Sequence, residues 1–240
     1  MTIHGKEENR MPINVKGMIT NDDDAPFYRD WFGMTVVSPA DILDALPRDG
    51  SDIDVEIASD GGEVDPATEI CTALRNYHGN VTVQIVANAY SAGTIIAMGA
   101  DKVQMAPGAK MMIHNASSGA EGNFHDMEHA SQMLQTTNKA IANMYAAKTG
   151  KPVQDFLDLM DQEKWLDADD AVELGLADEI QNFEPVTNSI GGSKISHRAV
   201  QKIQDLVKEN RKLKNAQNSQ PSNHEQLVQA KLAIFLDEGE

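Results

Sequence analysis

The amino-acid sequence predicts an α/β protein with a mostly parallel sheet and helices on both faces. Short β-like runs alternate with helical patterns from residue 13 to residue 114, as they do in βαβ units. Residues 81–87 (VTVQIVA) are rich in β-branched side chains and form the clearest strand. Two helices begin at a capping residue followed by proline, at Ser38-Pro39 and at Asp65-Pro66.

The remaining elements of the first half follow from the same signals. The two capped helices extend to about residues 46 and 77. The run at 54–59 (DVEIAS) is closed by a turn at Asp60-Gly61-Gly62, and residues 91–99 form a helix whose small apolar side chains predict burial. Four further segments have the composition of strands: residues 13–20, 54–59, 103–106 and 111–114.

The second half begins with a Gly/Ser/Asn-rich loop at residues 115–123 and a long helix at 126–148, which Gly150 and Pro152 end. Its apolar stripe fits either an arm that packs against another subunit or a helix that covers the sheet. Shorter helices at 153–160 and 167–174 complete the body. The stripe comprises Met127, Ala130, Leu134, Thr137, Ile141 and Met144.

Charge and composition exclude several classes of protein. The formal charge of −17 disfavours nucleic acid or an anionic membrane as the main partner, because phosphates would be repelled. Cys71 is the single cysteine, so no intrachain disulfide can form and a reducing compartment fits. Residues 1–10 lack the apolar stretch of a signal peptide, and the most apolar run, 85–100, is too short and too interrupted to span a membrane. We therefore expect a soluble, cytoplasmic protein.

Composition also predicts how the chain is divided. Residues 1–10 are polar and expected to be flexible, residues 11–187 form the folded domain, and residues 188–240 are a linker and a helix-prone, partly disordered tail. Within the tail, six Lys/Arg face two Asp/Glu over residues 197–214. The apolar spacing there fits two heptads or a lone solvated helix, with the candidate a and d positions at Ala199, Ile203, Leu206, Asn210 and Leu213.

Ser91 lies where a buried strand gives way to a buried helix. The helix N-terminus offers free N–H groups and a partial positive charge to an oxyanion, and the small neighbours Ala89, Ala92 and Gly93 let a substrate approach. Gly93 matches half of a nucleophile elbow, while Ala89 replaces its first glycine. Taken alone, the position fits a helix-capping serine better than a nucleophile.

Two further features favour catalysis. Gly61-Gly62 ends a strand expected to lie beside residues 81–87, so its free N–H groups and that of Ala92 could form a two-donor oxyanion hole. His114 follows the apolar run 111–113 at the carboxyl end of its strand, the edge where ligands bind in parallel sheets. A neutral imidazole there could take the Ser91 proton. Residues 160–167 offer several carboxylates as a third member, and the pattern does not choose among them.

These features resemble the proteolytic subunit of Clp protease over roughly residues 13–182. Four segments have the order and approximate spacing of that family: Gly61-Gly62, the Ser91 helix with Gly99-Ala100, residues 111–114 (MMIH), and residues 165–178 with Trp165-Leu166 and AVELGLAD. The resemblance implies a Clp protease/crotonase-like superhelical fold with a protruding handle helix, here at residues 115–150. It further implies serine endopeptidase activity in a ring-shaped homo-oligomer, without cofactor or metal.

Residue by residue, the resemblance makes Ser91 the nucleophile and His114 the base, with the N–H groups of Gly62 and Ala92 as the oxyanion hole. The family's orienting aspartate falls on Glu163, which is one methylene longer. Either Glu163 substitutes for it, or Asp161 takes over, or the imidazole is held less well.

The segments MPINVKGMITND and 28–37, with the tail, look most like Clp-related head-maturation proteases of tailed phages and prophages. That likeness implies capsid or scaffolding proteins as substrates in the cytoplasm of a bacterial host. An AAA+ unfoldase is a possible partner but not a required one.

Three rival hypotheses remain. Residues 125–129 spell the H-x-x-E-H pattern of a zinc protease class, although no third ligand is apparent. The enoyl-CoA hydratase class shares this fold and its paired-amide oxyanion hole, but has no use for a Ser91–His114 couple. A degenerate Clp-like assembly scaffold without activity is the non-enzymatic alternative, motivated by Glu163.

Overall fold

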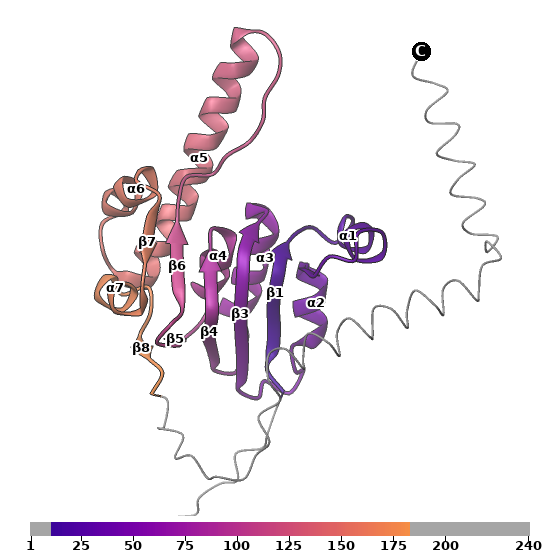
Figure 1. The fold of residues 1–240 in the computed structure, drawn as a ribbon, viewed down its shortest axis with the longest axis vertical. Helices are drawn as coiled ribbons and strands as arrows, with labels where there is room; N and C mark the ends of the chain where they lie inside the picture. The colour runs from indigo at the N-terminus through magenta and orange to yellow at the C-terminus, as the bar shows by residue number, and fades with distance from the viewer. Residues whose placement is uncertain (1–10, 183–240) are drawn as a thin grey trace, which may run out of the picture. The chain divides into compact units, whose positions relative to one another are not determined.

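An eight-stranded sheet forms the centre of the described part of the chain, and all but one of its strand pairs are parallel (Figure 1). The computed structural model describes residues 11–182. The predicted flexible N-terminus, the linker and the heptad segment lie outside these residues. The strands are β1 (Ile13–Ile19), β2 (Val36–Val37), β3 (Ile53–Gly62), β4 (Val81–Tyr90), β5 (Lys102–Met105), β6 (Lys110–Ile113), β7 (Lys164–Leu166) and β8 (Glu179–Ile180).

The strand order is β2-β1-β3-β4-β5-β8, and β4 pairs with β3 on one side and with both β5 and β6 on the other. Its first half pairs with β5, and its last residues pair with β6 through Asn88↔Lys110 and Tyr90↔Met112. β6 then pairs with β7 in the one antiparallel contact. The carboxyl ends of β3, β4 and β6 therefore lie at one edge of the sheet.

Alternating burial along β3 explains how the sheet is covered. Ile53, Val55 and Ile57 are buried, while Asp54 and Glu56 between them are exposed or half-buried. A strand covered on both faces would read as a continuous apolar run instead. Across β1, β3 and β4 one face thus carries the core and the other carries mostly polar side chains. The polar face includes an ion pair between Lys16 and Glu56 at 3.0 Å.

Most helices follow their local signals, but α3 begins at Val64 with Glu63 as its N-cap, so Asp65 lies inside the helix instead of capping it. In α2, Ser38 and Asp41 form a capping box at the predicted start. All six residues of α4 are buried, as their small size and lack of charge predict. None of the helices within residues 11–182 is long and apolar enough to cross a membrane. The helices are α1 (Ala25–Asp30), α2 (Pro39–Ala45), α3 (Val64–Arg75), α4 (Ala92–Ala97), α5 (Phe124–Thr149), α6 (Val153–Asp161) and α7 (Ala168–Leu174).

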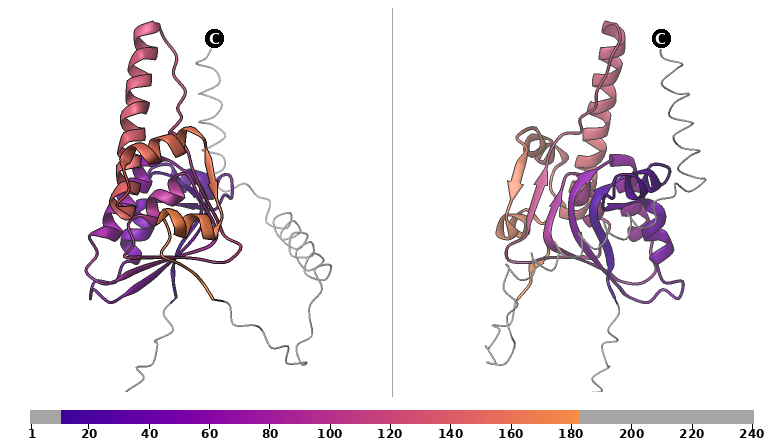
Figure 2. Two further views of the ribbon diagram at one scale, coloured as in Figure 1. Left: turned by 90° about the vertical axis from the view of Figure 1, so that its left-hand side faces the viewer. Right: turned by 45° about the vertical axis from the view of Figure 1, so that its right-hand side comes forward.

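Helix α5 has two different halves. Asn123 caps its start, Gly150 ends it in the left-handed conformation, and the first half projects away from the body (Figures 1 and 2). Only Ile141, Ala142 and Tyr145 of this helix are buried. The predicted stripe therefore belongs to the core at its carboxyl end alone, and the projecting half has the shape of an arm.

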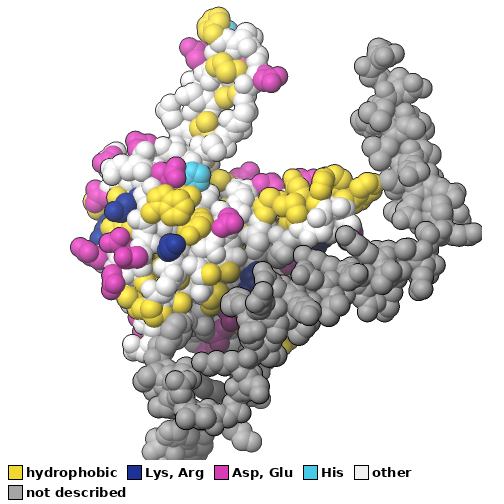
Figure 3. All heavy atoms as spheres, viewed as in Figure 1, with side chains coloured by type: hydrophobic (Ala, Val, Ile, Leu, Met, Phe, Trp, Pro, Cys, Tyr) yellow, Lys and Arg dark blue, Asp and Glu magenta, His cyan; other side chains and the backbone are white. Residues whose placement is uncertain are grey.

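Helix α1 carries an exposed aromatic cluster that the sequence pattern did not reveal. Phe27 contacts both Trp31 and Phe32, which follow the helix, and the ring centroids of Phe27 and Phe32 are 5.1 Å apart. They are between 48% and 62% exposed. Figure 3 shows hydrophobic side chains gathered over this helix.

Candidate active site

Ser91 occupies a sharp turn between β4 and α4. Its backbone has φ 52° and ψ −120°, one of two positive-φ conformations among non-glycine residues of the described chain. The hydroxyl makes no capping hydrogen bond to α4, so the capping interpretation of this serine fails. Two backbone contacts hold the turn: Ser91 N–H donates to the Met112 carbonyl at 2.8 Å, and Thr94 N–H donates to the Ser91 carbonyl at 2.9 Å. The strained turn thus leaves the hydroxyl free for another partner.

That partner is His114. Its Nε2 lies 2.7 Å from Ser91 Oγ, within hydrogen-bonding distance. The register explains the contact, because Tyr90 and Met112 are paired on neighbouring parallel strands and both chains leave the sheet at the same edge. When the ring carries its proton on Nδ1, Nε2 accepts from the Ser91 hydroxyl. A hydroxyl paired in this way can be deprotonated as it attacks a carbonyl carbon.

Gly61 abuts the Ser91 turn, and Gly62 follows it at the end of β3. A Cβ on Gly61 would lie 2.8 Å from Ser91 Cβ and 3.2 Å from the Ala92 nitrogen. Gly62 pairs with Ile19 of β1, whose carbonyl accepts from Glu63 N–H at 2.9 Å. In a parallel ladder a residue bonds to the two neighbours of its partner, so the N–H of Gly62 itself points away from β1.

Gly62 and Ser91 line the same small cavity, and Ala92 is the first residue of α4, where an N–H has no intrahelical acceptor. The arrangement is compatible with an oxyanion hole of Gly62 and Ala92, which remains a prediction.

Ser59 supports the Gly61-Gly62 end of β3, a role that sequence reasoning missed; this end is strand and not the predicted turn. Its buried hydroxyl donates to the Gly17 carbonyl at 2.6 Å and accepts from Gly61 N–H at 3.0 Å. The available signal was the alternation of β3, because Ser59 occupies an inward position that Ile53, Val55 and Ile57 fill with aliphatic groups. A buried hydroxyl at such a position requires partners, and here they are backbone groups beside the site.

A second supporting network was also missed. Thr94 of α4 donates through Oγ1 to the Ser91 carbonyl at 2.6 Å, and the same oxygen lies 2.6 Å from the Tyr145 hydroxyl of α5. Because threonine has a single hydroxyl proton, Tyr145 must be the donor in the second contact. Burial raises the pKa of Tyr145, so the phenol keeps its proton. The arm helix is thereby tied to the peptide group of Ser91.

The chain matches a known family. A family model described as Clp protease matches residues 37–184, more than half of the chain. The chain belongs to the Clp protease family. The mostly parallel sheet and the helices agree with the Clp/crotonase-like fold, and membership indicates a Clp-type peptidase.

Glu163, the expected third residue of the site, makes no hydrogen bond to His114 in this structure. Continuing the β6–β7 register past Ile113↔Lys164 places His114 opposite Glu163. However, Glu163 has φ 49°, which turns it out of the strand, and its Oε1 accepts from Trp165 Nε1 at 3.3 Å. Among residues 11–182, the His114 side chain is hydrogen-bonded to Ser91 alone.

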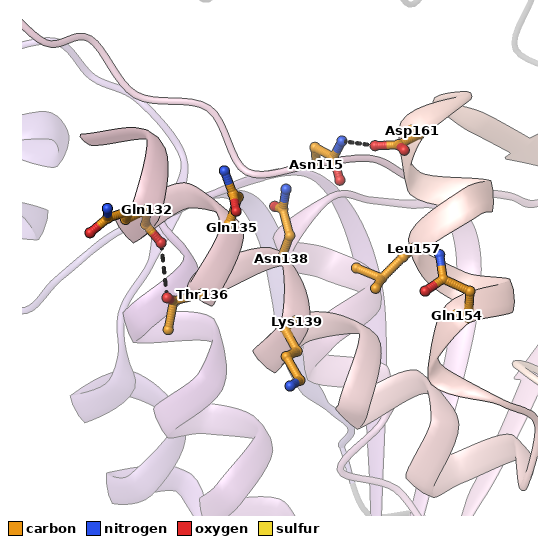
Figure 4. Close-up of a pocket in the computed structure, with 9 residues that line it drawn as sticks. All are labelled: Asn115, Gln132, Gln135, Thr136, Asn138, Lys139, Gln154, Leu157 and Asp161. Atoms are coloured by element: carbon orange, nitrogen blue, oxygen red, sulfur yellow. Dashed lines mark hydrogen bonds between the residues drawn. The ribbon is translucent and has the colours of Figure 1, made fainter. Parts of the chain in front are cut away.

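The alternative carboxylate, Asp161, is engaged elsewhere. Its Oδ1 accepts from Asn115 Nδ2, as Figure 4 shows. Both side chains line a cavity of about 650 Å³ between α5 and α6, whose other walls are mainly the amide side chains of those helices (Figure 4). The Asn115 Oδ1 is buried and has no partner among the described residues. Asp161 therefore orders the residue after His114 rather than the imidazole itself.

Two other candidate reactive groups are not among the residues that line the cavity beside Ser91. Cys71 of α3 is buried, and desolvation raises the pKa of its thiol to about 11, so it is no thiolate nucleophile near neutral pH. In the H-x-x-E-H segment, His125 Nδ1 lies 3.5 Å from Glu128 Oε2, and both side chains are exposed. Within residues 11–182 no group of three or more His, Cys, Asp or Glu could hold a metal ion.

Proposed function

We propose that this chain is a serine endopeptidase of the Clp type, with Ser91 as nucleophile and His114 as general base. The observation that carries the proposal is the 2.7 Å contact between Ser91 Oγ and His114 Nε2. It occurs at a strained strand-to-helix turn where the hydroxyl has no capping role. A merely structural serine at this position would be expected to bond to its own helix.

The reaction follows from these positions. Ser91 Oγ attacks the peptide carbonyl carbon while His114 Nε2 takes the hydroxyl proton. The resulting oxyanion faces the N–H groups of Gly62 and Ala92, each worth about 3–4 kcal/mol in such a role. The C–N bond then breaks, and His114 protonates the leaving amine. Water, deprotonated by His114, then attacks the acyl carbon, the C–O bond to Ser91 breaks, and His114 returns the proton to Ser91 Oγ.

Glu163 is the residue we propose to hold the imidazole. It follows the register of β6 and β7 to the position opposite His114, and reaching the imidazole requires a change of its positive φ together with exchange of its contact with the exposed Trp165. Moving from an indole N–H to an imidazole N–H retains a hydrogen bond for the carboxylate. The rotation therefore requires no buried charge to become unpaired.

The substrates are proposed from the resemblance to phage enzymes. The segments at 11–22 and 28–37 support a head-maturation protease that processes capsid or scaffolding proteins in the bacterial host cytoplasm. A ring-shaped homo-oligomer without a required unfoldase fits that role. The projecting half of α5, with Phe124 68% exposed, supports an arm that contacts a second copy.

The test uses the full chain, its Ser91→Ala variant and its His114→Ala variant. Wild type should react with a fluorophosphonate probe at Ser91, located by mass spectrometry, and should cleave casein. Each variant should lose about 10⁶-fold in rate while keeping the wild-type circular dichroism and oligomer mass. Cleavage that survives Ser91→Ala would contradict the proposed nucleophile.

The same material distinguishes the alternatives. A hydratase of the crotonase type would hydrate an enoyl thioester and ignore the fluorophosphonate. A scaffold would react with neither, and assembly of a capsid protein from the encoding genome would proceed equally with Ser91→Ala. Processing of that capsid protein by wild type alone would support the head-maturation role.

A further inference from the structure

A small cavity opens directly beside the proposed nucleophile. It has a volume of about 70 Å³, and Ser91 and His114 form one side of it. Val64 of α3, Ile95 of α4 and Ile141 of α5 contribute aliphatic walls. In a peptide, the side chain that precedes the scissile bond is attached next to the carbonyl carbon that the serine attacks. That side chain is therefore the substrate group positioned to enter this cavity.

The residues that line the cavity disfavour the entry of a charged substrate side chain. No lysine, arginine, aspartate or glutamate lines the cavity, and the Tyr145 hydroxyl at its edge is already bonded to Thr94. A charged side chain buried there would lose its hydration without gaining a partner, which is strongly unfavourable. An aliphatic side chain would gain contact with Val64, Ile95 and Ile141.

The cavity also excludes large groups. A dry protein cavity of about 150 Å³ holds a benzene ring, and this one has less than half that volume. The walls from α4 and α5 cannot readily retreat, since Ile95, Ile141 and Tyr145 are each at most 3% exposed. Tyr145 is further fixed by its contact with Phe156, ring centroid to centroid 5.6 Å.

We propose, on the basis of the endopeptidase function above, that this chain cleaves after small aliphatic residues, of alanine to valine size. Ile141 is the specificity-determining residue, because it lines the cavity from α5 and its aliphatic side chain takes no part in the proton transfer. Aromatic and charged residues before the scissile bond are rejected.

Peptidyl diphenyl phosphonates test the proposal without a known substrate. Four probes of one peptide sequence should end in the phosphonate analogue of alanine, valine, phenylalanine or lysine, with a small fluorophosphonate as the size-independent reference. Wild type should react with the alanyl or valyl probe at least about 100-fold faster than with the phenylalanyl and lysyl probes. Equal rates for alanyl and phenylalanyl probes would overturn the specificity while the fluorophosphonate reaction upheld the nucleophile. Failure of the fluorophosphonate to label Ser91 would instead overturn the endopeptidase proposal itself.

Variants then locate the filter. Ile141→Ala should reduce the preference over the phenylalanyl probe to below about 10-fold, because three carbons of wall are removed. Met144→Ala is the matched control: it lies on the same helix and packs against the core, but does not line the cavity. It should keep the wild-type ranking, and an equal change in both variants would contradict the assignment. Should Ile141→Ala not fold, Ile141→Val should still shift the ranking towards larger groups, and an unchanged ranking would refute the role of this residue.

Discussion

Removing the Tyr145 hydroxyl tests the network that holds the Ser91 peptide. Tyr145→Phe deletes the donor to Thr94 Oγ1 in a fully buried contact of 2.6 Å. Thr94 keeps its own proton bonded to the Ser91 carbonyl, so no buried donor is left unpaired. The expected loss is therefore about 1–2 kcal/mol of unfolding free energy.

Thr94→Val should cost more. It removes the acceptor of the Tyr145 proton and one of the two donors to the Ser91 carbonyl, leaving a buried hydroxyl without a partner. A loss of about 2–3 kcal/mol is expected. In the double variant the orphaned hydroxyl is gone, so its loss should fall short of the sum of the single losses by about 1 kcal/mol.

Urea denaturation followed by circular dichroism measures these values, at one fixed protein concentration because self-association would add to apparent stability. Tyr77→Phe is the control. Its hydroxyl donates to the Ser51 carbonyl at 2.7 Å in a partly buried site, and its loss should cost about 1 kcal/mol or less. A Tyr145→Phe variant as stable as wild type, or strictly additive losses in the double variant, would refute the network.

Two further substitutions test the site's backbone and its third residue. Gly62→Ala should lower the free energy of unfolding by at least about 3 kcal/mol, because a Cβ there would lie 2.0 Å from the Ile19 carbonyl oxygen at φ 153°. The control Gly108→Ala has open space around it and should be neutral or slightly stabilising in the same urea titration. Equal losses in the two variants would contradict the steric argument. Glu163→Ala should slow fluorophosphonate labelling by up to about 10⁴-fold, far more than Asp161→Ala. The opposite order of rates would assign the orienting role to Asp161.

The sequence predicted the central strands and the Ser91–His114 pair because both depend on local patterns. The glycine pair, the strand-to-helix step and the histidine at a strand end each signal the carboxyl edge of a parallel sheet. The short elements were missed for a physical reason. The missed elements span only two to six residues, too few for a periodic pattern: α1, β2, β7 and β8. The aromatic side chains in and after α1 are exposed, although aromatic residues in a sequence usually indicate a buried segment.

The supporting groups of the site could not be predicted, because they depend on tertiary contacts. Thr94 and Tyr145 are 51 positions apart, and neither has a local signal for the hydrogen bond they share. The direction of the Glu163 side chain is set by a positive φ, and the sequence did not predict it because position 163 is not a glycine or asparagine, the residues that usually adopt this conformation. The supporting role of Ser59 could have been predicted, since a hydroxyl among inward-facing aliphatic residues requires a hydrogen-bond partner.

The backbone at position 91 has a consequence for the whole domain. A φ of 52° suits glycine, yet glycine has no oxygen with which to attack a carbonyl. Keeping serine there costs about 1–3 kcal/mol, a considerable fraction of the roughly 5–15 kcal/mol by which domains remain folded. The wholly buried helix α4 that follows must therefore offset the destabilisation caused by the backbone of the proposed nucleophile.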